Sequence, residues 1–354
     1  MIDSAHVVDA VVVGAGPSGS SAALSLVREG MSVTMIGNAR RASWAGETLP
    51  PGAGEVMAGV FGASILNKHQ RAYAVNAAWE SSHLHETDAM SHPLGAGWLL
   101  DRLVFDAEVE QVACAAGVRF VHGQATLEKG HGLRWSVTAD SHRVEANWLV
   151  DATGRPAHMA RRLGARVLRS GRMLAYVCRM DADGSRVAAT SLEATSKGWW
   201  YTTPLPRGGR VAAYITDVDL GHQSGSLTGW WLDRLAETEH IRGLVDCSAE
   251  ITVTISDAGT GYLNRCAGQG WVAVGDAAAH FDPLSSQGLL TGVLMGARVA
   301  QAIAHDKLED WQVDYEMIVA EHNMLRSHYY SLVDRWADST FWGRRSTELR
   351  KVVS

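Results

Sequence analysis

Cysteine is scarce in this chain and is never placed where it could hold a metal. The four cysteines, Cys114, Cys178, Cys247 and Cys266, are isolated from one another, without C-x-x-C or metal-ligand spacing. Zinc sites and secreted disulfide frameworks are recognised by characteristic cysteine spacings. We therefore expect no metal site, and four free thiols in the reducing environment of the cytoplasm.

Long apolar runs and basic clusters are also missing. No stretch approaches the roughly 18 apolar residues of a membrane-spanning helix, and the N-terminal residues lack the charged and apolar regions of a secretory signal. The net charge of −6, without any basic run, argues against a nucleic-acid-binding protein. We expect a cytoplasmic protein with no membrane segment and no nucleic-acid partner.

The bulk composition is that of an ordinary globular protein. Of the 354 residues, 46% are hydrophobic and 20% are charged, which is typical of packed domains. A chain of this length forms one large domain or two interleaved ones. The 13 tryptophans are a surplus, so we expect some of them to serve a ligand.

The stretch from Asp9 to Gly30 predicts the start of a dinucleotide-binding βαβ unit. Val11 to Val13 are typical of a short buried parallel strand, helix formers follow from Ser20 to Arg28, and a second strand is expected over Ser32 to Ile36.

Three glycines, Gly14, Gly16 and Gly19, stand between the first strand and the helix at the G-x-G-x-x-G spacing. The first allows a tight turn, the second lets the backbone approach a pyrophosphate, and the third lets helix and strand pack closely. The helix N-terminus then receives the phosphate charge.

One part of this fingerprint is absent. An acidic residue normally follows about 20 residues later and binds the ribose hydroxyls, but Gly37 occupies that place. We expect Asn38, Arg40 or Arg41 to contact the adenosine ribose instead, and tightly bound NAD is disfavoured.

Regular elements and loops alternate through the first 146 residues. The segment from Arg40 to Gly54 is rich in glycine and proline, which predicts an ordered loop beside the site. The other elements expected here are a helix over 55–68, a strand over 72–79, an amphipathic helix over 99–117, a parallel strand over 118–121 and a strand pair over 125–146.

In the second half of the chain, the expected strand arrangement changes from parallel to antiparallel and back again. An apolar strand from Asn147 runs into Asp151 and a turn of small residues, where backbone could approach a ligand. From Arg166 to about Gly261, alternating strands rich in aromatic residues predict a mostly antiparallel sheet with a short helix over 229–239. The parallel pattern then returns with a strand over 270–279, a loop over 280–288, a buried helix over 289–304 and a helical tail over 308–350.

Three separated motifs now occur in a fixed order: the glycine loop at Gly14, the D-A-T-G turn at Asp151, and the G-D…D-P…G stretch from Gly275 to Gly288. Together they resemble the FAD-binding fold of the aromatic-hydroxylase type over nearly the whole chain. The resemblance implies an α/β protein with a Rossmann-like FAD-binding domain, an inserted, mostly antiparallel β-sheet substrate domain and a C-terminal helical segment. The expected boundaries are 1–78, 100–165 and 264–305 for the FAD-binding domain, 79–99 and 166–263 for the substrate domain, and 306–354 for the helical segment.

The resemblance also implies roles for particular residues. Asp276 would hydrogen-bond the ribityl or ribose part of FAD, and Arg102 would lie along the pyrophosphate. The loop from Asp282 to Gly288 would open a helix beneath the flavin pyrimidine ring, where the helix dipole favours negative charge by about 0.3–2 kcal/mol. No histidine or cysteine can be placed at a flavin methyl group, so FAD is expected to be bound non-covalently. The cofactor-binding residues expected in this way are Gly14, Gly16, Ser18, Gly19, Arg41, Glu47, Thr48, Leu49, Arg102, Asp151, Gly154, Gly275, Asp276, Pro283, Gln287 and Gly288.

Four segments narrow the resemblance. They read W-A-G-E-T-L-P-P from Trp44, G-W-W-Y-T-T-P-L-P from Gly198, D-P-L-S-S-Q-G from Asp282 and D-R-W-A-D-S-T-F-W-G-R-R from Asp334. These segments resemble the LodB/GoxB-like flavoproteins, which are related to tryptophan halogenases and geranylgeranyl reductases. Members of that set hydroxylate a tryptophan of a partner oxidase as it becomes a tryptophan-derived quinone cofactor. The resemblance implies an FAD-dependent monooxygenase whose partner is the precursor protein of such a quinone enzyme.

The chain departs from the related halogenases in one strand. Flavin halogenases place a lysine on the strand after the G-E-x-x-x-P loop, to relay hypohalous acid. The corresponding segment here, Ala72 to Trp79, contains no lysine, and Asn76 stands nearest to the expected place. Their W-x-W-x-I-P motif is also absent, so halogenation is disfavoured.

Candidate catalytic and substrate residues follow from the same loops. Glu47 lies in the loop expected over the flavin and is the candidate base. His280, directly before the flavin loop, either fills a polar catalytic role or bonds to backbone. Trp199, Trp200 and Tyr201 either form an aromatic wall for an indole substrate or belong to the sheet's core.

Other functions remain open at this stage. They are a small-molecule hydroxylase, a halogenase, an alkene (prenyl) reductase that shares the G-E-x-L-P-P loop type, and a non-enzymatic FAD-binding maturation chaperone. The chain has no second nucleotide fingerprint, so NAD(P)H either docks transiently or a separate flavin reductase supplies the electrons. Oxygen consumption with NAD(P)H would separate the hydroxylase from the reductase and the chaperone.

Overall fold

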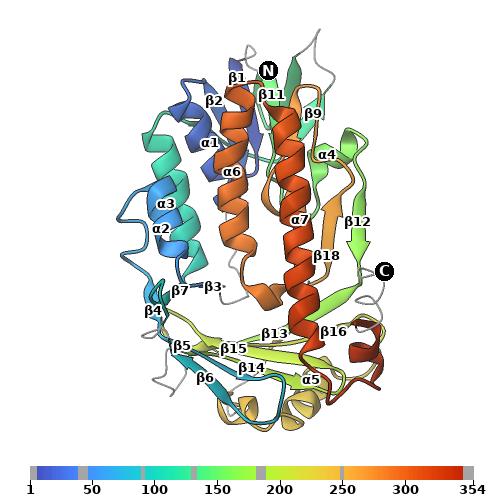
Figure 1. Ribbon diagram of the computed structural model, residues 1–354. Coiled ribbons are helices and arrows are strands. Elements are labelled where there is room, and N and C mark those ends of the chain that lie inside the picture. The colour runs from blue at the N-terminus through green and yellow to red at the C-terminus, as the bar shows by residue number, and fades with distance from the viewer. Residues whose placement is uncertain are drawn as a thin grey trace.

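A parallel sheet flanked by helices stands on a second, mostly antiparallel sheet (Figure 1). The computed structural model describes residues 6–38, 47–88, 92–128, 134–180, 189–247 and 251–345. The fold class expected from the sequence, an α/β protein with an FAD-type Rossmann-like domain and an inserted sheet, is confirmed.

The parallel sheet has the strand order β20-β11-β1-β2-β8. Its strands are β1 (His6–Val13), β2 (Val33–Gly37), β8 (Arg119–His122), β11 (His142–Asp151) and β20 (Trp271–Ala273). Three short strands extend it in antiparallel pairing, β9 (Ala125–Glu128), β10 (Trp135–Ala139) and β19 (Ala267–Gly268). The strand pair expected over 125–146 is therefore a set of three strands, β9, β10 and the first part of β11.

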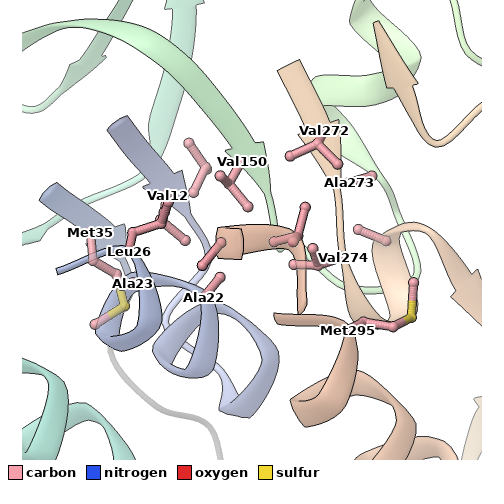
Figure 2. Packing of buried hydrophobic residues seen from close by; sticks show 14 of the residues in the cluster. Val12, Ala22, Ala23, Leu26, Met35, Val150, Val272, Ala273, Val274 and Met295 are labelled. Carbon is pink, nitrogen blue, oxygen red and sulfur yellow. The ribbon is translucent and has the colours of Figure 1, made fainter. Parts of the chain in front are cut away.

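The helices of this half are α1 (Pro17–Arg28), α2 (Ala53–Phe61), α3 (Arg102–Ala115), α4 (His158–Arg162), α6 (Gly288–Ala304) and α7 (Leu308–Ser331). Figure 2 shows part of the core shared by the sheet and two of these helices: Val12, Val150 and Val272 of three adjacent strands, Ala22 of α1 and Met295 of α6 belong to one cluster. All five side chains are buried.

Helices α1 and α6 pack without large side chains between them. A Cβ added at Gly296 of α6 would collide with the carbonyl oxygen of Ser18, and the Ser21 hydroxyl donates to the carbonyl oxygen of Val293 at 2.7 Å. Because glycine and serine are small, the two helix backbones approach closely. This contact brings the N-termini of both helices to one end of the parallel sheet.

The second sheet has seven strands in the order β17-β13-β16-β15-β14-β5-β6. They are β5 (Ala74–Ala78), β6 (His85–Asp88), β13 (Met173–Met180), β14 (Ala189–Thr195), β15 (Gly198–Pro204), β16 (Arg210–Asp217) and β17 (Val253–Asp257). All pairs are antiparallel except β14 with β5. Helix α5 (Leu227–Ala236) covers the face that points away from the parallel sheet (Figure 1).

Two three-stranded sheets complete the described structure. One has the order β3-β7-β4, from Glu47–Leu49, Gly97–Leu100 and Gln70–Ala72. The other has the order β12-β18-β21, from Val167–Ser170, Thr260–Leu263 and Ala279–His280. Short 3-10 turns occupy η2 (Ile241–Gly243), η3 (Gly275–Ala277) and η4 (Pro283–Ser285).

Several element boundaries differ from the sequence-based expectation. The helix expected from Leu99 begins at Arg102, because Leu99 and Leu100 pair in β7 and the Asp101 carboxylate caps the helix by accepting from Leu103 N at 3.0 Å and Val104 N at 3.2 Å. The helix expected over 55–68 ends at Phe61, where Gly62 adopts a φ of 100°.

The strand expected over 72–79 is β5, which pairs with β14 in the seven-stranded sheet. That sheet therefore begins before the expected domain boundary at residue 78. In the C-terminal tail, α7 ends at Ser331, and a further helical stretch covers 340–345.

Candidate active site

A cleft of about 620 Å³ lies where the two halves of the fold meet. The parallel half supplies the glycine loop, the turn after β11 and the start of α6, and the seven-stranded sheet supplies the opposite wall. Of the cofactor-binding residues expected from the sequence, those that line the cleft are Gly16, Ser18, Gly19, Glu47, Thr48, Arg102, Gly154, Asp276, Pro283, Gln287 and Gly288.

The three glycines of the first loop have different surroundings. Gly14 has a φ of +114°, and a Cβ added there would collide with the carbonyl of Ala152. A Cβ at Gly19 would collide with the carbonyl of Gly14. A Cβ at Gly16, which lines the cleft, would meet no atom within 4 Å. Gly14 and Gly19 are therefore required by the fold itself, whereas Gly16 leaves free space in front of the α1 N-terminus.

Arg102 and Glu47 form an ion pair at the side of the cleft. The Arg102 Nη1 donates to Glu47 Oε2 at 3.0 Å, and its Nε donates to Asp106 Oδ1 at 2.9 Å. Burial alone would lower the pKa of Arg102, but the two carboxylates outweigh it and raise that pKa above its ordinary value. The guanidinium therefore stays charged, and the two acids fix its orientation.

The turn after β11 is held from behind by Asp151. Its carboxylate accepts from the Thr153 hydroxyl at 2.7 Å, from Thr153 N at 3.0 Å and from Ala160 N at 2.7 Å. Asp151 is fully buried and does not line the cleft. Its position therefore shapes the turn that presents Gly154 and Arg155.

Arg155 was not singled out from the sequence, although it follows the D-A-T-G turn directly. It donates to the carbonyl oxygens of Gly259 at 3.0 Å and Phe281 at 3.2 Å. Its Nε lies 3.7 Å from Asp276 Oδ2, and the Asp276 side chain is 44% exposed. The Asp276 carboxylate is thus open to a ligand and lies beside a positive charge.

The loop before α6 forms the floor of the cleft. Asp282 is buried, and its carboxylate accepts from Leu284 N at 3.0 Å. Ser286 adopts a left-handed φ of 50°, and Gln287, Gly288 and Leu289 line the cleft as α6 begins. The positive end of the α6 dipole is therefore directed at the cleft.

The opposite wall is aromatic, but only two of the three expected residues form it. Trp199 and Tyr201 line the cleft, whereas Trp200 packs on the far face of the sheet against Trp231 at a ring distance of 4.9 Å. Successive side chains of a strand point to opposite faces, so the three neighbours cannot share one wall. Burial raises the pKa of the Tyr201 phenol, and the Glu47 carboxylate raises it further.

Some expected residues lie behind the cleft and not in it. His280 is buried with its ring against Gly261 of β18, and burial, helped by Arg155, lowers its pKa. Leu49 belongs to the hydrophobic core. Gly275, with a φ of +58°, packs against Ser18. Arg41 lies outside the described residues.

Strand β5 is the place where the related halogenases are expected to carry their relay lysine. Val75 lines the cleft, and Asn76, the residue expected nearest to the halogenase lysine, therefore points to the other face. Among the described residues that line the cleft there is no lysine, no cysteine and no histidine. The described residues also contain no cluster of histidine, cysteine or acidic side chains able to hold a metal ion.

These features fit FAD. The space at Gly16 leaves room for the pyrophosphate, Arg102 and the N-termini of α1 and α6 offer positive charge, and the Asp276 carboxylate is free to accept from a ribose or ribityl hydroxyl. The aromatic and apolar wall beyond them suits a flat ring system. Fold and cleft together define a flavin-binding α/β oxidoreductase.

Comparison with known proteins gives the family. The profile of the tryptophan halogenase family matches residues 56–352. The chain belongs to this family, and it is an FAD-dependent enzyme of the oxidoreductase type.

Individual relatives agree with this placement. LodB from Marinomonas mediterranea, named as an FAD-dependent oxidoreductase, is 26% identical, and the match covers 95% of this chain and 96% of LodB. The structure of QhpG, a peptidyl tryptophan dihydroxylase essential for tryptophylquinone cofactor biogenesis, superposes with a TM-score of 0.76 at 23% identity, covering 96% of this chain and 78% of QhpG. The myxobacterial chondrochloren halogenase CndH superposes with a TM-score of 0.82 at 18% identity, covering 96% of this chain and 86% of CndH. The resemblance to LodB-like flavoproteins expected from the sequence is confirmed.

Among the described helices, none combines the length and the apolar composition needed to cross a membrane.

Proposed function

We propose that this enzyme is a monooxygenase that hydroxylates a tryptophan side chain within a polypeptide. The polypeptide would be the precursor of an oxidase or dehydrogenase that carries a tryptophan-derived quinone. The observation that carries the proposal is the cleft wall, in which Trp199 and Tyr201 line the cleft and no lysine occurs among the described lining residues. The printed name of QhpG, a peptidyl tryptophan dihydroxylase, supports the same chemistry, and that of LodB supports an FAD-dependent oxidoreductase.

FAD, when bound and reduced, activates O2 and supplies an electrophilic oxygen atom. One atom of O2 replaces a ring hydrogen as hydroxyl and the other leaves as water. NAD(P)H, directly or through a separate flavin reductase, supplies the two electrons.

The chain's own residues perform the remaining tasks. Trp199 is 1% exposed and belongs to the core behind the wall, so the partly exposed Tyr201 would stack on the indole, for about 0.5–1.5 kcal/mol beyond simple burial. Glu47 lines the cleft and is held in place by Arg102, whose Nη1 lies 3.0 Å from Glu47 Oε2, so this carboxylate would accept the proton that leaves the ring carbon. The phenol of Tyr201 keeps its proton because burial raises its pKa, and it would donate a hydrogen bond to oxygen. His280 does not line the cleft, so the proposal gives it no catalytic step.

The decisive experiment compares substrates. The FAD-loaded enzyme, with NADH and a flavin reductase, is incubated with a candidate precursor protein of a tryptophan-derived quinone enzyme and, separately, with free tryptophan. Mass spectrometry should find oxygen added to a tryptophan of the precursor. Hydroxylation of free tryptophan alone would identify a small-molecule hydroxylase instead.

The halogenase alternative is tested in the same reactions by adding bromide. The absence of lysine from the described cleft lining predicts no bromine in any product. Bromination of the precursor or of free tryptophan would overturn the proposal.

A further inference from the structure

A second hollow, of about 840 Å³, lies beside the cleft and is lined mainly by positive side chains. We call it the arginine groove; its arginines are Arg155, Arg161, Arg162, Arg166 and Arg169. Asp257 is the one acid among its described lining residues, and it is already paired with Arg169 at 3.0 Å. The whole chain has a net charge of −6, so this local excess of positive charge favours a negatively charged ligand.

Several of these guanidinium groups are accessible to a ligand. Arg161, Arg162 and Arg166 are exposed, and within the described parts of the chain no carboxylate lies within ion-pair distance of Arg162 or Arg166. An arginine fork binds a carboxylate through two parallel hydrogen bonds. The arginine groove can therefore accept more than one carboxylate at once.

The backbone beside the groove is also available. Strand β12 (Val167–Ser170) pairs with β18, and no other strand among those described pairs with it. Figure 1 shows β12 at the outer margin of the molecule. An edge strand presents unpaired N–H and C=O groups, to which an extended peptide can add as a further strand. Arg166 directly precedes β12, Arg169 lies within it, and both line the groove.

The groove leads to the active site. Arg155 and Asp257 line both the arginine groove and the cleft. A chain lying along β12 could therefore direct one of its side chains past Arg155 towards the aromatic wall at Trp199.

We propose that the arginine groove binds an acidic, extended segment of the polypeptide whose tryptophan enters the cleft. The inference rests on the proposed function only for the role of that tryptophan. A nicotinamide dinucleotide is the competing anion, but the groove lacks the means to hold a pyrophosphate: no glycine occurs among its described lining residues, in contrast to the loop at Gly16. Arginines spread over α4 and an edge strand suit a row of carboxylates better than one compact pyrophosphate.

The test measures binding without turnover. The probe is a short fluorescein-labelled peptide of alternating Glu and Val with one central Trp, and its partner has Gln in place of every Glu. Fluorescence anisotropy gives the Kd of each for the FAD-loaded enzyme. The variant R162Q/R166Q removes two groove charges, and R242Q/R298Q removes two exposed charges that do not line the groove.

We expect the acidic peptide to bind at least about tenfold more tightly than its Gln partner. R162Q/R166Q should weaken it by a similar factor and flatten its salt dependence, while R242Q/R298Q should leave Kd unchanged. Flavin content and circular dichroism confirm that both variants are folded.

Three results would overturn the inference: no binding of the acidic peptide, equal binding of the two peptides, or an unchanged Kd in R162Q/R166Q. If this variant instead raised the KM for NADPH in oxygen uptake without changing peptide affinity, the groove would be a nucleotide site. A peptide that binds but is never hydroxylated would count against the proposed function and not against the groove.

Discussion

The indole nitrogen of Trp199 donates a hydrogen bond to the phenolic oxygen of Tyr330 at a distance of 3.0 Å. Tyr330 in turn donates to Asp282 Oδ2 at 2.8 Å. This chain of bonds joins the cleft wall on β15, the end of α7 and the loop before α6. The C-terminal helix therefore positions the active site although Tyr330 does not itself line the cleft.

Replacing this phenol should destabilise the protein. Tyr330→Phe leaves the buried Trp199 nitrogen without its acceptor and removes a donor from Asp282, which we expect to lower the free energy of unfolding by about 1–3 kcal/mol. Urea denaturation measures the change. Tyr329→Phe is the matched control, since the Tyr329 side chain is exposed and should change stability little. Equal effects of the two substitutions would contradict the role given to Tyr330.

Alanine substitutions at Gly14 and Gly16 should have different effects, the first on folding and the second on FAD binding. Gly14→Ala forces a side chain into the Ala152 carbonyl at a positive φ and should destabilise the fold by about 1–3 kcal/mol or more. Gly16→Ala meets no protein atom within 4 Å, so its melting temperature without FAD should be unchanged while its FAD affinity falls. Thermal melting of the flavin-free proteins, together with flavin titration, separates the two effects. Normal FAD binding by Gly16→Ala would show that the pyrophosphate does not lie next to Gly16.

Asp276 should matter for the cofactor and little for the fold. Its side chain is 44% exposed and contacts Arg155 only at 3.7 Å, so Asp276→Ala should keep the chain folded. Loss of a charge-assisted hydrogen bond to FAD would weaken binding by about 1.5–3 kcal/mol, and the purified variant should be nearly colourless. Asp314→Ala on α7 is the control. Full flavin content in Asp276→Ala would refute the assignment.

FAD should be released by acid. The described cleft lining contains no histidine or cysteine, the side chains that most often attach to a flavin ring. Trichloroacetic acid precipitation should leave the yellow colour in the supernatant. Colour that stays with the pellet would mean a covalent bond.

The stability of the protein should fall in mild acid because of His322. Burial, helped by the neighbouring Arg326, lowers the pKa of His322 to about 4, below the 6.5 of an exposed histidine. Between these values the unfolded chain binds the proton and the folded chain does not, so stability is lost as the pH falls from 6.5 towards 4, by at most about 3 kcal/mol.

His322→Phe keeps the stacking on Phe281, whose ring centroid lies 3.9 Å away, and removes the titrating group. The variant should lose less stability than the parent between pH 6.5 and pH 4 in urea denaturation. An unchanged pH dependence would assign the acid sensitivity to other groups.

The sequence was most informative where a motif demands a particular backbone. The glycine loop, the turn at Gly154 and the approach to α6 were found from their residue types, because each needs small residues or a helix start at a fixed spacing. The sequence could not separate the residues that line the cleft from those behind it. Asp151 was expected to bind the cofactor, but its carboxylate is used entirely by Thr153 and Ala160.

Long-range contacts were beyond the reach of sequence patterns. Tyr330 lies 48 residues from Asp282 and 131 residues from Trp199, and no local periodicity indicates that the three meet. Trp200 was grouped with Trp199 by adjacency, although strand alternation alone would have divided them. Among arginines, Arg155 shows no local signal beyond its place after a glycine turn.

The close packing of α1 against α6 has a consequence for the biosynthesis of the enzyme. Ser21 and Val293, which meet in this contact, are separated by 272 residues. During translation the face of α1 that packs on α6 therefore has no packing partner until most of the chain has been synthesised. Such late, non-local contacts slow folding and expose apolar surface meanwhile. Because the start of α6 lines the cleft, the complete flavin site can form only after the chain beyond residue 288 has been made.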